Sequence, residues 1–166
     1  MGNAQTGDLD QEYETLCQSY DSKTGARQIS SADVIEKLNS KEQVYILDTR
    51  SEAEHLVSSL PNCHLLVPSL GILSISYTTP LPEVTEIPKD ATIICHCTAG
   101  LRSGWAAVDL EKKWNRKVFS LHGGIISWSN AGGHLYDADG KETSRVHCYS
   151  NTWGKYLKDQ NNVVTE

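Results

Sequence analysis

Short runs of apolar residues alternate along the chain with segments whose apolar positions recur at helical spacing. The runs cover residues 44–47, 64–67, 92–95 and 117–121, and most are bounded by polar residues, proline or glycine. Runs of this length and composition predict short buried β-strands. The segments between them predict helices, because their apolar residues fall three or four positions apart.

Helix start and stop signals support this alternation. Residues 30–38 predict an amphipathic helix capped by Ser30 or Ser31, and residues 51–54 open another with a capping box. A third helix is predicted over 105–114, and a short one follows Gly123 and Gly124 and ends at Gly132. Strands that alternate with helices predict an α/β fold with a largely parallel sheet covered on both faces.

Three regions are less regular. Residues 70–88 carry three prolines, which favour a surface loop or a broken helix. Residues 1–25 form an acidic N-terminal tail, which we expect to be partly helical and docked, with the first ten residues loose. After a domain at 26–138, a polar C-terminal extension at 139–166 is interpreted as a packed appendage, with Trp153, Tyr156 and Leu157 as anchors of a docked helix.

Composition narrows the class of protein. The chain has 166 residues and a formal net charge of −6, with no basic stripe, so we expect no nucleic-acid partner. No apolar segment approaches the ~18 residues of a membrane span, and no signal peptide is evident. The five cysteines are irregularly spaced, which favours free thiols in a reducing compartment and a cytoplasmic location. Cys95-His96-Cys97 is too tight for an ordinary zinc pair, so we expect no metal.

Residues 2–6 fit the pattern for N-myristoylation of Gly2. The alternative is a chance match in a flexible start. A single acyl chain binds membranes weakly, so we expect membrane contact only if Gly2 is acylated. Cys17 is interpreted as a packed cysteine and not as a second lipidation site.

The candidate chemistry lies at residues 97–103, Cys-Thr-Ala-Gly-Leu-Arg-Ser. Cys97 follows the strand predicted at 92–95 and precedes the helix predicted at 105–114. Ligands of parallel sheets bind at the carboxyl ends of strands. Backbone N–H groups of such a loop, with those of the first helical turn, form an anion cradle. We therefore predict a reactive thiolate at Cys97.

Three segments in this order resemble the rhodanese family of single-domain sulfurtransferases, over about residues 29–137. Residues 45–50, followed by Glu52, Glu54 and His55, resemble the family's first signature. Residues 97–102 resemble its six-residue active-site loop, and residues 121–128 with Gly132 and Gly133 its closing signature. The family's Gly-His-Ile-Pro-Gly-Ala turn is poorly matched at 58–63. The resemblance implies a five-stranded, mostly parallel sheet.

The resemblance also implies a mechanism. Cys97 takes a sulfane sulfur from thiosulfate or a persulfide, carries it as a persulfide, and passes it to a thiol acceptor, which could be a protein thiol. No cofactor is required, and we expect a monomer. The backbone N–H groups that would hold the persulfide belong to Thr98, Ala99, Gly100, Leu101 and Arg102.

The side chains around this loop leave alternatives open. Thr98 could add a hydrogen bond to the sulfur, and Arg102 would either favour an anionic donor or brace the loop by pairing with a carboxylate. Asp48 and Arg50 would lie near the loop or simply stabilise the strand end. The loop has no further basic residue, so we expect thiosulfate to be a mediocre donor.

Two other classes of function compete with sulfur transfer. Protein tyrosine phosphatases use Cys-x5-Arg, whereas residues 97–102 read Cys-x4-Arg, which disfavours a phosphatase or arsenate reductase on the same fold. A non-catalytic interaction module is disfavoured because Cys97 is present. Cys95 is interpreted as core, with a resolving thiol as the alternative. The remaining secondary candidates are Cys63 and Cys148 as resolving thiols, His96 and His122 as neighbours that tune Cys97, and Trp105 and Trp128 as core or pocket wall.

Overall fold

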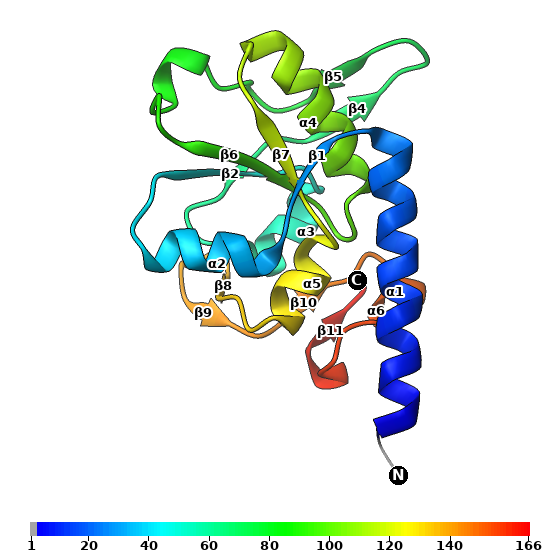
Figure 1. Ribbon diagram of the computed structural model, residues 1–166. Coiled ribbons are helices and arrows are strands. Elements are labelled where there is room, and N and C mark those ends of the chain that lie inside the picture. Colours follow the sequence, from blue (N-terminus) through cyan, green and yellow to red (C-terminus); the bar gives the residue numbers. More distant parts are fainter. Residues whose placement is uncertain (1–2) are drawn as a thin grey trace.

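A five-stranded parallel sheet forms the centre of the molecule, in the order β1-β7-β6-β2-β3 (Figure 1). The computed structural model describes the backbone of residues 3–166 and the side chains of residues 7–166. The expected fold class is confirmed. The strands are listed here with their bounds: β1 (Arg27–Ile29), β2 (Val44–Asp48), β3 (His64–Leu65), β6 (Thr92–His96) and β7 (Val118–Leu121). The strand β1 was not predicted, because three residues are too few to show a period.

Alternate residues of the central strands bury two separate cores. In β2, Ile46 faces one core and Leu47 faces the other; in β6, Ile94 and Ile93 divide in the same way. Helix α4 (Leu101–Trp114) packs against one face of the sheet. Helices α2 (Ser31–Asn39) and α5 (Gly124–Asn130) cover the other, so both faces are buried as the apolar runs predict.

Local sequence signals set the helix starts. Ser30 caps α2, with its hydroxyl accepting from the Asp33 N–H at 3.1 Å. Ser51 and Glu54 form the predicted capping box of α3 (Glu52–Val57). Helix α4 begins four residues before its predicted start, because Gly100 adopts a φ of 113° and turns the chain directly into the helix. Only residues 97–100 therefore separate β6 from α4.

The proline-rich region contains a short antiparallel hairpin, so the expectation of a broken helix is wrong. Strand β4 (Pro68–Leu70) pairs with β5 (Ile75–Tyr77), and a 3₁₀ turn, η1 (Val84–Glu86), follows. Strands of three residues carry too little alternation to be recognised from sequence. Ile72 and Leu73 at the hairpin tip are fully exposed.

Helix α1 (Asn3–Thr24) runs along the side of the domain (Figure 1). The expectation of loose first residues is therefore wrong for residues 3–10, while Gly2 lies outside the described residues. Leu9, Tyr13, Leu16 and Tyr20 form an apolar stripe at helical spacing, and Tyr13 and Cys17 enter the core. The expectation of a partly helical, docked N-terminal segment is therefore confirmed, and the surface that stabilises the stripe exists only in the folded domain.

The C-terminal extension packs against α1 and α5. Its elements are β9 (Glu142–Thr143), β10 (Val146–His147), α6 (Asn151–Gly154), η2 (Gln160–Asn162) and β11 (Val163–Val164). Strand β9 pairs with β8 (Leu135–Tyr136) at the end of the domain. Tyr156 and Leu157 are buried, as expected of anchors. Lys155 pairs with Glu12 of α1 at 2.7 Å, and the Tyr156 hydroxyl donates to the same carboxylate. Within residues 3–166, no helix combines the length and apolarity that a membrane crossing requires.

Candidate active site

Cys97 lies where the central strand β6 ends, in the short loop that leads into α4. The loop is held from beneath by the start of α5, because the Ile125 N–H donates to the Cys97 carbonyl at 2.8 Å. The approach requires a glycine: a Cβ on Gly124, whose φ is 57°, would lie 2.4 Å from that carbonyl oxygen. Tyr13 of α1 adds a hydroxyl that donates to the Gly123 carbonyl at 2.6 Å.

The Cys97 sulfur is surrounded by hydrogen-bond donors. The Gly100 N–H lies 3.2 Å from Sγ and the Ser103 N–H lies 3.4 Å from it. The Ser103 hydroxyl is also 3.4 Å away, and it pairs with the Ser120 hydroxyl at 2.8 Å. These donors, with the first turn of α4, stabilise negative charge on sulfur. Gly100 and Ser103 therefore assemble the cradle. Ser103 ends the stretch that the sequence analysis singled out, but the sequence assigned it no role.

Arg102 forms a bidentate ion pair with Glu54 of α3. Its two terminal nitrogens lie 2.8 and 2.9 Å from the two carboxylate oxygens, and Nη2 also donates to the Thr98 hydroxyl at 2.9 Å. Thr98 in turn donates to Glu54 at 3.3 Å. Of the two roles considered for Arg102, the structure supports the brace. Thr98 is committed to this brace and makes no hydrogen bond to the sulfur.

Burial alone would raise the pKa of Glu54. Hydrogen bonds and charge from Arg102, with donors from Ser51, outweigh it and hold the pKa at about 2. Glu54 is thus charged at neutral pH, and it neutralises Arg102. The site consequently offers little net positive charge to an anionic donor.

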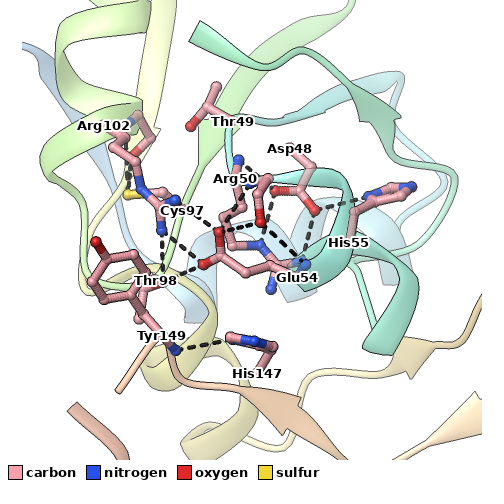
Figure 2. A network of polar contacts seen from close by, with 12 residues as sticks. Asp48, Thr49, Arg50, Glu54, His55, Cys97, Thr98, Arg102, His147 and Tyr149 are labelled. Carbon is pink, nitrogen blue, oxygen red and sulfur yellow. Dashed lines mark hydrogen bonds and ion pairs between the residues drawn. The ribbon is translucent and has the colours of Figure 1, made fainter. Parts of the chain in front are cut away.

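Asp48 and Arg50 form a second, fully buried pair beside Glu54 (Figure 2). The Arg50 Nη2 atom lies 2.6 Å from Asp48 Oδ2 and 2.6 Å from the Ser58 carbonyl. His55 adds a contact to Asp48 at 2.9 Å. Asp48 and Arg50 are held by each other, by His55 and by the backbone, so they act as scaffold for the elements that carry Glu54 and Cys97.

His96 lies beside Asp48, with its Nε2 atom 3.7 Å from Asp48 Oδ2 and 3.5 Å from the Cys63 sulfur. Burial, only partly offset by the Asp48 charge, lowers the pKa of His96 to about 4, so the ring is neutral. Ligand atoms of Asp48, Cys63 and His96 all lie within 4.8 Å of one another, which a metal ion could bridge. The buried Arg50 guanidinium beside them opposes a further positive charge.

The other predicted neighbours are placed away from the sulfur. His122 bridges Glu14 and Asp21 of α1, at 2.9 and 2.6 Å. Cys95 faces the core under α4, as predicted, and burial raises its thiol pKa. Cys148 is also buried, which raises its pKa to about 11. Trp128 is core, whereas Trp105 lies beside the β4–β5 hairpin.

A pocket of about 280 Å³ opens over Cys97. The active-site loop forms its floor, with Ala99, Leu101 and Arg102. Its walls come from Tyr20 of α1 and from Tyr149 and Trp153 of the C-terminal extension. Sequence reasoning did not connect these three aromatic residues with the site, because nothing local to residues 20, 149 or 153 indicates that both ends of the chain converge there.

Comparison with known proteins shows the family and the fold. Residues 30–131 match the model of the rhodanese-like domain. A sulfurtransferase of Allochromatium vinosum is 30% identical over 105 residues, which cover 63% of this chain and 90% of that protein.

Two solved structures share the fold at lower identity. The BH2092 protein of Bacillus halodurans has a TM-score of 0.57 and 17% identity, over 87% of this chain and 98% of that one. A thiosulfate sulfurtransferase of Pseudomonas aeruginosa has a TM-score of 0.53 and 20% identity, over 87% of this chain. The aligned part spans only 26% of that longer protein. Because the family model covers more than half of the chain, the chain belongs to the rhodanese-like family.

Proposed function

We propose that this member of the rhodanese-like family is a sulfurtransferase that carries sulfane sulfur on Cys97. One observation carries the proposal. The Cys97 sulfur lines a pocket and accepts hydrogen bonds from the backbone N–H groups of Gly100 and Ser103. The sulfurtransferase of Allochromatium vinosum, which the chain matches over 90% of that protein's length, supports the same reaction class.

In the first half-reaction the Cys97 thiolate attacks the outer sulfur of a donor. A bond forms between the two sulfurs, and the donor's own S–S bond breaks. The electron pair of that bond leaves with the donor remnant, as sulfite from thiosulfate or as a thiolate from an organic persulfide. The persulfide on Cys97 keeps one negative charge, which the N–H groups of Gly100 and Ser103 stabilise.

In the second half-reaction a thiolate acceptor attacks the terminal sulfur of the persulfide. The acceptor leaves as a persulfide, and the electron pair of the broken bond returns to Cys97 as thiolate. No electrons are gained or lost overall. Covalent catalysis of this kind predicts ping-pong kinetics.

The test is intact-mass spectrometry after brief incubation with thiosulfate, with a small organic persulfide and with no donor. We expect a gain of one sulfur atom that disappears when cyanide or a thiol is added. Cys97→Ser should lose the adduct. Cys63→Ser is the matched control, because Cys63 contacts His96 and does not line the pocket, and it should keep the adduct.

Other results would overturn the proposal. An adduct that survives in Cys97→Ser would place the persulfide on another thiol. Absence of an adduct with every donor, together with hydrolysis of p-nitrophenyl phosphate, would assign the site to phosphate-ester chemistry. Absence of both reactions would leave a non-catalytic interaction module.

A further inference from the structure

The pocket over Cys97 has an aromatic rim built by segments outside the matched family domain. Tyr20 precedes residues 30–131, and Tyr149 and Trp153 follow them. Tyr20 and Trp153 lie with ring centroids 6.0 Å apart, and Trp153 continues to Tyr156 at 6.4 Å. The two ends of the chain thus meet over the sulfur through contacting rings.

Tyr149 is held over the site in an unusual backbone conformation. Its φ is 70°, in the left-handed region that a bulky side chain rarely occupies. The conformation is fixed because the Tyr149 N–H donates to His147 Nδ1 at 3.1 Å and the neighbouring Cys148 N–H donates to Val164 at 2.8 Å. Tyr149 is nevertheless 60% exposed, and the Arg102 guanidinium lies 5.3 Å from its ring centroid (Figure 2). An exposed aromatic ring held at this backbone angle points to a role in binding.

The charge of the pocket disfavours a small dianion. Among the residues that line the pocket, Arg102 carries the positive charge. Glu54 already pairs with both terminal nitrogens of Arg102. Thiosulfate would therefore find backbone N–H groups but no unpaired cation. The pocket volume of about 280 Å³ is several times the ~30 Å³ that one water occupies, which leaves room for an organic group beside the transferred sulfur.

From this rim we infer that the site selects a sulfane sulfur carried on an aromatic or apolar organic group, with Tyr20, Tyr149 and Trp153 binding that group. The inference rests on the proposed function and names its donor class. An aryl thiosulfonate is the probe: the Cys97 thiolate takes its outer sulfur, the S–S bond breaks, and the electron pair leaves with the aryl sulfinate. The product is the same Cys97 persulfide that thiosulfate would give.

The experiment compares kcat/KM for benzenethiosulfonate with kcat/KM for thiosulfate, using one thiol acceptor. In the wild type the ratio should exceed ten. Trp153→Ala and Tyr149→Ala should each lower the ratio about tenfold, the effect expected of a lost aromatic contact. Trp153→Phe and Tyr149→Phe should retain most of it, because a ring remains. Tyr45→Ala is the control, since Tyr45 lies on β2 and stacks on His64 away from the pocket.

The outcomes separate this inference from the proposed function. A ratio that stays within twofold of wild type in both alanine variants, while sulfur transfer continues, overturns the aromatic subsite alone. If neither donor forms the persulfide on folded protein, the proposed function is overturned, and the donor class with it. A lowered ratio in Tyr45→Ala as well would show a general packing effect and would also overturn the inference.

Discussion

Replacing Glu54 by glutamine tests whether the Arg102 pair holds the active-site loop. Glutamine has nearly the shape of a protonated glutamate, so Glu54→Gln removes the charge and little volume. A carboxyl whose pKa falls from 4.5 to about 2 gains roughly 3 kcal/mol in its charged form, at ~1.4 kcal/mol per pKa unit. Because the Arg102 side chain is 26% exposed, solvent screens part of this, and we expect a loss of about 2 kcal/mol at neutral pH.

The stabilisation that charged Glu54 provides should depend on pH. The folded state lowers the pKa of Glu54, so this stabilisation is present above about pH 4.5 and is lost as the pH falls toward about 2. Urea unfolding at several pH values should therefore show a difference in unfolding free energy between wild type and Glu54→Gln that shrinks on acidification. In Glu54→Gln the positive charge of Arg102 is no longer neutralised by a carboxylate. The KM for the anion thiosulfate should therefore fall severalfold.

An exposed ion pair serves as the control for the Glu54–Arg102 pair. Glu111 contacts Arg27 at 2.7 Å, but the two side chains are 35% and 49% exposed. Glu111→Gln should cost less than about 1 kcal/mol. The reasoning would be refuted if Glu54→Gln cost no more than Glu111→Gln, or if its cost did not shrink at low pH.

Ser103→Ala should lower kcat/KM about fivefold, as expected for one hydrogen bond of ~1 kcal/mol, and unchanged kinetics would remove its hydroxyl from the site. Gly124→Ala should unfold the loop or lower the melting temperature sharply, whereas Gly132→Ala, with open space around it, should cost only about 1 kcal/mol by calorimetry. Burial lowers the pKa of His122, but Glu14 and Asp21 outweigh it, so the pKa is raised overall. The ion pairs of His122 with these two carboxylates therefore stabilise α1 below about pH 6.5, and the stabilisation is lost as the pH rises through the raised pKa. Hydrogen exchange of α1 amides should therefore quicken at alkaline pH beyond its intrinsic rise, and His122→Gln should abolish that excess.

The parts of the fold that sequence patterns predicted are those with strong local signals. The strands at β2 and β6, the caps at Ser30 and Ser51, and the placement of Cys97 at a strand end all follow from runs and spacings within ten or so residues. Strand β1 and the β4–β5 hairpin were missed because three-residue strands have no measurable period.

The rest of the site depends on long-range contacts. Glu54 and Arg102 are 48 positions apart, so the capping box predicted for Glu54 gave no sign of its second partner. Tyr20 and Trp153 meet only because α1 and the C-terminal extension dock on the same side of the domain. Contacts of that kind are decided by the tertiary packing of the whole chain, which no local pattern encodes.

The distribution of thiols makes the protein suited to selective labelling. The chain has five cysteines, and burial raises the thiol pKa of Cys17, Cys63, Cys95 and Cys148. Thiolates are the species that alkylating reagents attack, so these four react slowly in the native protein. Cys97, in contrast, lines the pocket between α1 and the C-terminal extension. A fluorescent iodoacetamide should then mark this position in native protein without any cysteine being removed, and the appearance of four more labels would time global unfolding.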